Sequence, residues 1–249
     1  MAFPKPIIAL HQIELSSICD LACRYCPSPV LQRPKVHMTL EHLDAALKHV
    51  RYFVERGSQS EVNATGIGES TIHPEFVECV RRIRAAIGKH VRITIPTNGI
   101  SLTAEMVNAV KLYNPRFWVS LHQPTRAAAG IHLLKEAGLL ENCTMDPAVN
   151  PNDWAGAVDL GKALKLPQAG VLPLQTIACP WLNYGWAMVM ADGRVSTCCL
   201  DASGVGVVGH VEDALGSLKV KPYSLCTGCY QRVDDPSWDQ KAGAPRGGA

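Results

Sequence analysis

Three cysteines fall within eight residues near the start of the chain, at Cys19, Cys23 and Cys26. Their spacing, C-x3-C-x2-C, follows an apolar run at residues 7–15 that predicts a β-strand. A closed iron–sulfur site normally takes four protein ligands, so three thiolates would leave one iron open to a small molecule. A structural zinc knuckle or simple burial are the alternatives, but zinc sites usually pair C-x2-C motifs at a distance.

Composition limits the function classes. The chain of 249 residues is 47% hydrophobic, enough to bury the core of one large domain, or of one domain plus a small appendage. Its net charge of +2, without a basic run, gives no electrostatic case for binding nucleic acid or a membrane surface. No signal peptide or membrane span is evident, so we expect a cytoplasmic location. There, ten cysteines indicate metal or cofactor ligation rather than disulfides.

The elements that must position these cysteines alternate along residues 1–175. We expect strands at residues 7–15, 61–65, 91–96, 117–121, 142–145 and 170–175. We expect helices at residues 40–53, 74–87, 103–112, 127–137 and 154–164, with Pro74 in the first turn of the second. Five or six such units are too few for a full barrel, which takes roughly 250 residues. The pattern predicts an α/β fold, a partial (β/α)5–6 TIM-like barrel with its chemistry at the carboxyl ends of the strands.

The pattern changes after residue 175. Asp192-Gly193 is a turn pair between two apolar runs and predicts a β-hairpin at residues 186–199. An extended stretch at residues 204–211 and a short helix at residues 212–218 are expected next. We therefore expect three parts: a barrel at residues 1–175, a small hairpin-and-helix domain at residues 176–233, and a frayed tail at residues 234–249.

The cysteine motif, with Tyr25 before its last cysteine, resembles the radical S-adenosylmethionine (radical SAM) superfamily. In that family a 4Fe–4S cluster with an open iron site chelates the amino and carboxylate groups of S-adenosylmethionine (SAM). One electron then cleaves SAM to methionine and a 5′-deoxyadenosyl radical. The resemblance implies that Cys19, Cys23 and Cys26 hold this cluster.

Three later segments resemble the same family and would end consecutive strands. Gly66-Ile67-Gly68-Glu69 is similar to its glycine-glycine-glutamate segment, although Ser70 stands where proline is usual. Thr97-Asn98-Gly99 and the Ser120-Leu121-His122 region match segments that reach SAM. Ordinary βα turns and a structural histidine remain the alternatives. The resemblance implies cofactor contacts from Tyr25, Gly68, Glu69, Ser70, Thr97, Asn98 and Ser120.

Four C-terminal cysteines form a second signal. Cys179, Gly193 and Cys198 have the spacing C-x13-G-x4-C, and Cys226-x2-Cys229 follows. This resembles the SPASM/twitch extension of radical SAM enzymes, in its shorter twitch form. The resemblance implies an auxiliary 4Fe–4S cluster held by Cys179, Cys198, Cys226 and Cys229. Cys199 is an alternative to Cys198, and a four-cysteine zinc site is an alternative to the cluster.

An auxiliary cluster could accept a second electron from a substrate radical, which gives a two-electron oxidation. The size and layout resemble radical SAM enzymes that oxidise aminocyclitols, the 2-deoxy-scyllo-inosamine dehydrogenases. We expect an oxidoreductase that acts on a small polar metabolite, an amino sugar or cyclitol, with a flavodoxin- or ferredoxin-type electron donor. The catalytic candidates are His122 and Asp146, and further candidate substrate contacts are Gln123 and Asn150. The alternatives are a maturase that modifies a ribosomally made peptide and a non-catalytic zinc-binding interaction protein.

Overall fold

The computed structural model describes residues 3–144, 154, 158, 179–227 and 229, and the structural statements below refer to these residues. Their main feature is a sheet of eight strands in the order β6-β5-β4-β3-β2-β7-β8-β9. In chain order, its strands are β2 (Ala9–Ile13), β3 (Glu61–Ala64), β4 (Arg92–Thr97), β5 (Arg116–Ser120), β6 (Leu140–Thr144), β7 (Trp186–Val189), β8 (Arg194–Ser196) and β9 (Val207–His210). A separate pair joins β1 (Lys5–Pro6) to β10 (Lys219–Val220).

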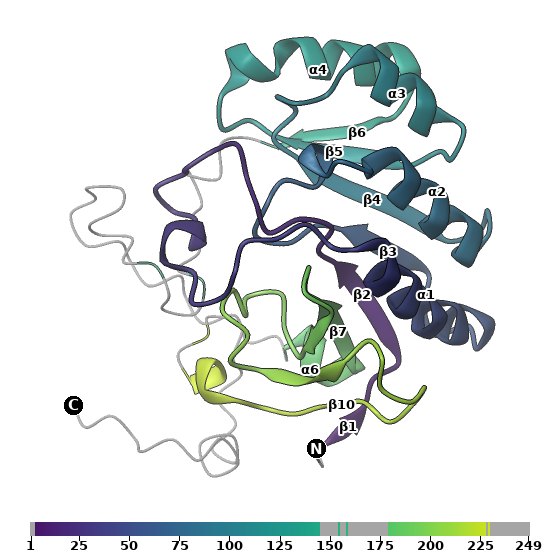
Figure 1. The fold of residues 1–249 in the computed structure, drawn as a ribbon, viewed down its shortest axis with the longest axis vertical. Helices are drawn as coiled ribbons and strands as arrows, with labels where there is room; N and C mark the ends of the chain where they lie inside the picture. Colours follow the sequence, from purple (N-terminus) through teal and green to yellow (C-terminus); the bar gives the residue numbers. More distant parts are fainter. Residues whose placement is uncertain (1–2, 145–153, 155–157, 159–178, 228, 230–249) are drawn as a thin grey trace.

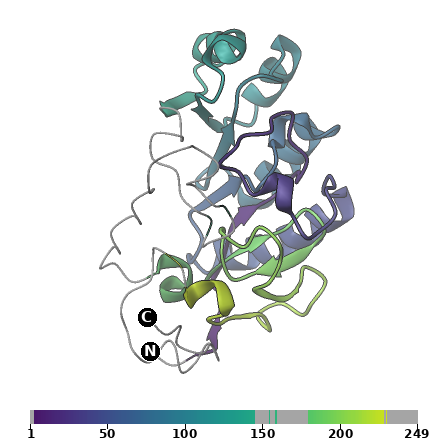
Figure 2. The same ribbon diagram turned by 90° about the vertical axis from the view of Figure 1, so that its left-hand side faces the viewer.

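Strands β2 to β6 run parallel, as the alternation in the sequence predicts. The helices between them are α1 (Leu40–Glu55), α2 (Phe76–Ile87), α3 (Ala104–Lys111) and α4 (Pro124–Ala137). Figures 1 and 2 show these helices along one side of the curved row of strands. This confirms the expected α/β partial barrel, in which the carboxyl ends of the parallel strands meet at one edge. No helix in the described ranges is long and apolar enough to cross a membrane.

Helix α1 shows why the sequence folds in this way. The side-chain oxygen of Thr39 accepts a hydrogen bond from the backbone N–H of His42 at 3.2 Å, which satisfies an open amide of the first turn. The apolar stripe of the helix, including Leu43, Leu47 and Val50, is buried in the main core. Each such side chain contributes about 1.5–3 kcal/mol on burial, so packing holds the helix in place.

The C-terminal hairpin continues the same sheet. Strand β7 lies parallel to β2, and β8 and β9 follow as antiparallel neighbours. Gly193 turns the chain between β7 and β8 with a φ of 85°, a left-handed conformation that favours glycine. Helix α6 (Pro180–Tyr184) precedes β7, with Cys179 as its N-cap residue. The predicted hairpin is confirmed, whereas the domain boundary at residue 175 stays a prediction because it falls outside the described residues.

Two local predictions are wrong. Helix α2 begins at Phe76 rather than at Pro74, because the ring Nδ1 of His73 accepts a hydrogen bond from the backbone N–H of Glu75 and shapes a turn there. Residues 212–218 form turns instead of a helix. The carboxylate of Asp213 accepts a hydrogen bond from the backbone N–H of His210 at 2.8 Å, and Gly216 has a φ of 77°.

Several predicted elements lie outside the described residues. These are the helix at residues 154–164, apart from Trp154 and Val158, the strand at residues 170–175, and the tail at residues 234–249.

Candidate functional site

A cavity of about 250 Å³ opens where strands β2 to β5 end. Its walls combine the cysteine loop with the three strand-end segments singled out in the sequence. They include Cys19, Cys23, Tyr25, Cys26, residues 65–69, residues 96–98, Ser120, His122 and Trp154. Segments up to about 130 positions apart therefore meet in one hollow, as expected for chemistry at this edge of a parallel sheet.

The three N-terminal thiols have surroundings that fit an iron–sulfur cluster. Backbone N–H groups point at two of the sulfurs, from Leu21 to Cys19 Sγ and from Ser28 to Cys26 Sγ, both at 3.4 Å. Such bonds stabilise thiolate ligands and influence the potential of a bound cluster. Burial raises the pKa of Cys19 to about 12 in the metal-free protein, and the nearby Glu69 and Asp20 act in the same direction. A bound metal reverses this preference, because coordination deprotonates a thiol.

Within the described residues, no three histidine, cysteine or acidic side chains are gathered in a way that could hold one metal ion. The thiols of Cys19, Cys23 and Cys26 instead share the walls of one cavity. Three thiols placed around a hollow can be bridged by a group of several metal atoms. Thiolates are the protein ligands that iron–sulfur clusters take, so the donor set fits such a cluster by its chemistry.

The glycine loop lies directly against the chain that leaves β2. A Cβ atom on Gly68 would lie 2.3 Å from the carbonyl oxygen of Ile18, and the backbone N–H of Glu69 donates to that same oxygen at 2.8 Å. A Cβ atom on Gly66 would lie 2.2 Å from Cγ of Glu14. Both glycines are therefore needed for close backbone approach, and that approach brings this loop next to the cysteine loop.

The side chain of Glu69 holds neighbouring loops together. One carboxylate oxygen accepts hydrogen bonds from the Thr97 hydroxyl at 2.8 Å and the Thr71 hydroxyl at 2.7 Å. The other accepts from the backbone N–H of Asn98 at 2.7 Å. Burial raises the pKa of Glu69, although these bonds favour its charged form. Ser70 does not line the cavity, because its hydroxyl donates to the carbonyl oxygen of Ala64 at 2.8 Å.

The remaining candidates on β4 and β5 face the cavity. Asn98 Nδ2 donates to Asp20 Oδ1 at 2.6 Å, so the end of β4 is tied to the cysteine loop. The Tyr25 hydroxyl is hydrogen-bonded to Nδ1 of His122. The indole N–H of Trp154 donates to the carbonyl oxygen of Tyr25 at 3.1 Å and closes this side. Of the other candidates, Gln123 is the N-cap residue of α4, and Asp146 and Asn150 lie outside the described residues.

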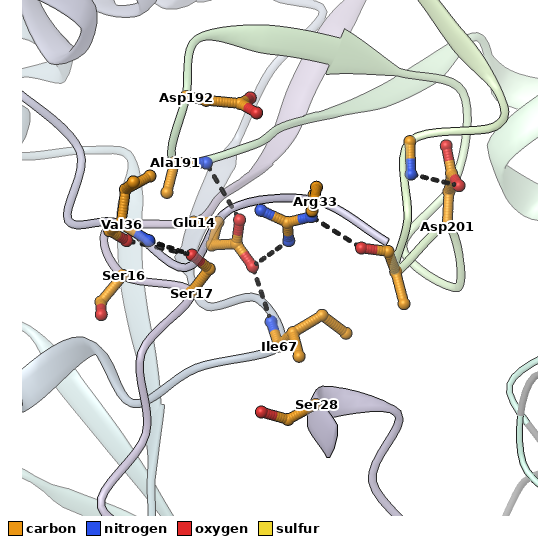
Figure 3. A network of polar contacts seen from close by, with 12 residues as sticks. Glu14, Ser16, Ser17, Ser28, Arg33, Val36, Ile67, Ala191, Asp192 and Asp201 are labelled. Carbon is orange, nitrogen blue, oxygen red and sulfur yellow. Dashed lines mark hydrogen bonds and ion pairs between the residues drawn. The ribbon is translucent and has the colours of Figure 1, made fainter. Parts of the chain in front are cut away.

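Sequence reasoning missed a buried ion pair beside the cavity. Glu14 and Arg33 lie 2.8 Å apart, and their side chains are 0% and 2% exposed. Figure 3 shows Glu14 between Arg33, Ile67 and Ala191. A usable signal was present, because a carboxylate at the end of an apolar strand needs a partner when it is buried. The roles of Asp20 and Trp154 had no comparable signal, since they depend on long-range contacts.

The C-terminal cysteines lie near one another in a second cluster of side chains. Burial raises the pKa of Cys226 to about 12, and the proximity of Cys198, Cys179 and Cys229 raises it further. The pKa of Cys198 is raised, mainly by a side-chain hydrogen bond with Cys199 and secondly by burial. The apolar side chains around these thiols are Trp181, Met188, Met190, Leu200 and, partly buried, Trp186 and Tyr223. The four cysteines are thus near one another on α6, on the hairpin, on η4 (Ser224–Thr227) and just after η4, although no three described side chains there are gathered around a single metal ion.

Comparisons with known proteins agree with this geometry. A family model described as the Radical SAM superfamily matches residues 13–154, more than half of the chain. The structure is similar to that of BtrN in complex with AdoMet and 2-DOIA, with a TM-score of 0.66, 17% identity, and coverage of 84% of this chain and 80% of that one. It is also similar to anSMEcpe with bound AdoMet, with a TM-score of 0.56, 15% identity and coverage of 93% and 87%. A comparison with curated proteins gives no significant match.

Proposed function

The chain belongs to the radical SAM superfamily, and from this premise we propose that it is an oxidoreductase that removes two electrons from a small polar metabolite. SAM and a 4Fe–4S cluster are the cofactors of its family. The observation that carries the proposal is the second group of thiols: Cys179, Cys198 and Cys229 pack in one cluster of side chains, with Cys226 near them. A second cluster held there supplies an electron acceptor beside the barrel.

In this proposal the cavity residues divide into two roles. Cys19, Cys23 and Cys26 hold the cluster that reacts with SAM, and the glycine loop and Asn98 hold SAM itself. When bound, the cofactors would supply a 5′-deoxyadenosyl radical that can remove a hydrogen atom from a carbinol carbon of the substrate. The protein's own part is to position SAM, to shape the cavity and to keep the substrate next to a proton acceptor.

Completing the oxidation requires the loss of one proton and one electron from the substrate radical, which leaves a ketone. A cluster held by Cys179, Cys198, Cys226 and Cys229 would accept the electron. We assign the proton to His122, which lines the cavity and is hydrogen-bonded to Tyr25. A histidine suits this role because its ordinary pKa is near neutrality. Asp146 remains the second candidate by its position in the sequence.

An amino sugar or cyclitol is the substrate class that we favour. The structure of BtrN contains the small molecule 2-DOIA, and its fold is similar to this one. The structure of anSMEcpe with the Cp18Cys peptide has a TM-score of 0.54 to this chain, so a peptide substrate is the competing proposal.

The electron that starts the reaction would come from a flavodoxin- or ferredoxin-type protein. We propose a cytoplasmic location, because a reducing compartment keeps cysteines available as ligands for iron–sulfur clusters.

Deuterium transfer tests the proposal. The anaerobically purified protein with reconstituted clusters would be given SAM, dithionite and a panel of amino sugars and cyclitols deuterated at their carbinol carbons. We expect deuterium in 5′-deoxyadenosine together with a ketone product that is two electrons more oxidised. A Cys23→Ala variant is the matched control and should form neither. Deuterium transfer without oxidation would contradict the dehydrogenase assignment, and transfer from a peptide panel instead would favour the maturase.

Metal analysis separates the enzyme from the non-catalytic alternative. An iron–sulfur protein is brown and contains iron and sulfide, whereas a zinc-binding interaction protein is colourless. Two zinc ions and no iron after anaerobic purification would overturn the enzyme proposal.

A further inference from the structure

The ion pair between Glu14 and Arg33 joins three parts of the fold that are distant in sequence. Glu14 follows β2, the strand that pairs with β3 on one side and β7 on the other. Oε1 of Glu14 accepts hydrogen bonds from the backbone N–H of Ile67 at 2.9 Å and from Nη2 of Arg33 at 2.8 Å. Its Oε2 accepts from the backbone N–H of Ala191 at 2.9 Å. One carboxylate therefore contacts the segments that follow both neighbouring strands.

Arg33 extends this contact to the chain beyond Cys198. Its Nε donates to the carbonyl oxygen of Ala202 at 2.6 Å while its Nη2 bonds Glu14. Figure 3 shows the guanidinium between Glu14 and the loop that leads to Asp201. The planar fork of arginine makes both contacts at once, which the single ammonium of lysine does less well.

The partners on the two sides belong to two different sites. Ile67 lies in the glycine loop and lines the cavity that we assign to SAM. Ala191 and Ala202 flank the segment that carries Cys198, one of the four clustered C-terminal thiols. The glycine at position 66 is itself required by this arrangement, because a Cβ atom there would overlap Glu14.

Fold stability alone does not require such a pair. Replacing a buried ion pair by apolar side chains of similar volume is often neutral or stabilising, because the charges must be desolvated. A carboxylate fixed by three N–H donors does, however, set the relative positions of the groups that it binds. Movement of the Ile67 amide on ligand binding would therefore displace the Glu14 carboxylate, and with it the contacts to Ala191 and, through Arg33, to Ala202.

We propose that Glu14 and Arg33 are positioning residues that couple SAM binding at the glycine loop to the order of the segment carrying Cys198. The inference rests on the assignment of the cavity to SAM, and it does not depend on which substrate is oxidised. It predicts that SAM binding slows hydrogen exchange in residues 186–204, although these residues do not line the cavity.

The test compares hydrogen exchange and SAM affinity in the anaerobically reconstituted protein and three variants. In the unaltered protein, saturating SAM should slow exchange in residues 186–204. Arg33→Met should lose this effect and raise the dissociation constant of SAM by about fivefold or more, the lower end of typical coupling between sites. Arg33→Lys keeps the charge beside Glu14 and should restore part of both. Arg82→Met, which breaks partly exposed ion pairs of α2 with Asp44 on α1 and with Glu78, is the matched control and should behave like the unaltered protein.

The outcomes separate this inference from the assignment on which it rests. If SAM binds the unaltered protein but leaves exchange in residues 186–204 unchanged, the coupling is refuted and the SAM site stands. If SAM does not bind at all, both are refuted. If Arg33→Met does not fold, the result for Arg33→Lys decides whether the pair couples the two sites. An Arg33→Lys protein with lower thermal stability, but with unchanged SAM affinity and unchanged slowing of exchange in residues 186–204, would show that the pair is purely structural.

Discussion

The side-chain amide of Asn98 donates to the carboxylate of Asp20 at 2.6 Å, and so ties the end of β4 to the cysteine loop. Asn98 is also held from the other side, because its backbone N–H donates to Glu69 at 2.7 Å. Three loops that line the cavity therefore share one chain of hydrogen bonds. The geometry of the proposed SAM site would depend on these bonds as well as on the groups that touch the cofactor.

Asp20→Ala should weaken SAM turnover without removing the cluster. Loss of a hydrogen bond to a charged group costs about 1.5–3 kcal/mol, or about tenfold to 100-fold in kcat/KM for 5′-deoxyadenosine formation. Because Asp20 and Asn98 share one contact, the double variant with Asn98→Ala should lose less than the sum of the single variants. Glu105→Ala, an exposed acidic residue in the first turn of α3, is the control. Fully additive losses would show that the two residues act separately.

Gly68→Ala should displace the glycine loop. The added Cβ would lie 2.3 Å from the carbonyl oxygen of Ile18, and backbone must shift to relieve that overlap. A displacement of this size costs on the order of 10²-fold in kcat/KM for SAM cleavage. Gly57→Ala is the control, since nothing lies within 4 Å of its Cβ and its φ of 68° adds strain alone. That variant should lose about 1–2 kcal/mol of stability and keep its SAM kinetics. Equal kinetic losses in the two variants would contradict this explanation.

Cys198→Ala should remove the auxiliary cluster, and Cys199→Ala should not. The thiol of Cys198 lies near those of Cys179 and Cys226, which fits a shared ligand set. Iron analysis of the anaerobically purified variants should therefore show a loss of about four iron atoms per chain for Cys198→Ala. SAM cleavage at the first cluster should continue in both variants. The reverse pattern of iron loss would identify Cys199 as the ligand.

His49 should make the protein less stable in mild acid. The residue is 2% exposed, and burial lowers its pKa from the ordinary value of 6.5, against the opposing effects of its bond to the Val211 carbonyl and of Asp213. Below pH 6.5, His49 therefore takes up a proton in the unfolded chain but stays neutral in the folded protein. The free energy of unfolding falls as the pH drops from 6.5 toward the pKa of folded His49.

Urea unfolding between pH 8 and 5 measures this effect, whose slope is at most about 1.4 kcal/mol per pH unit for one proton. His49→Gln keeps a donor for Val211 and should flatten the curve below pH 6.5. His132→Gln, on the exposed side of α4, should leave it unchanged. If stability falls with pH as steeply in His49→Gln as in the unaltered protein, other groups cause the acid sensitivity.

Local patterns in the sequence were sufficient to predict the class of fold and the place of the site. The spacing of Cys19, Cys23 and Cys26, and the alternation of strands and helices, depend on neighbours along the chain. The turn at Asp192-Gly193 is local as well, and Gly193 turns the chain there. The helix expected at residues 212–218 is absent from the described segment. The hydrogen bond that the carboxylate of Asp213 accepts from the backbone N–H of His210 outweighs the weak helix propensity there.

Only the tertiary structure decided how the buried polar groups are paired. Ser70 looked like a cofactor contact, but its hydroxyl bonds Ala64. Glu69 directs its carboxylate to Thr97 and Asn98. Glu14 finds its partners up to 177 positions away, because β7 pairs with β2 and brings Ala191 beside it. Periodicity and motif spacing report which residues are close along one element, whereas a buried charge is satisfied by whichever donors the packing of separate elements brings to it.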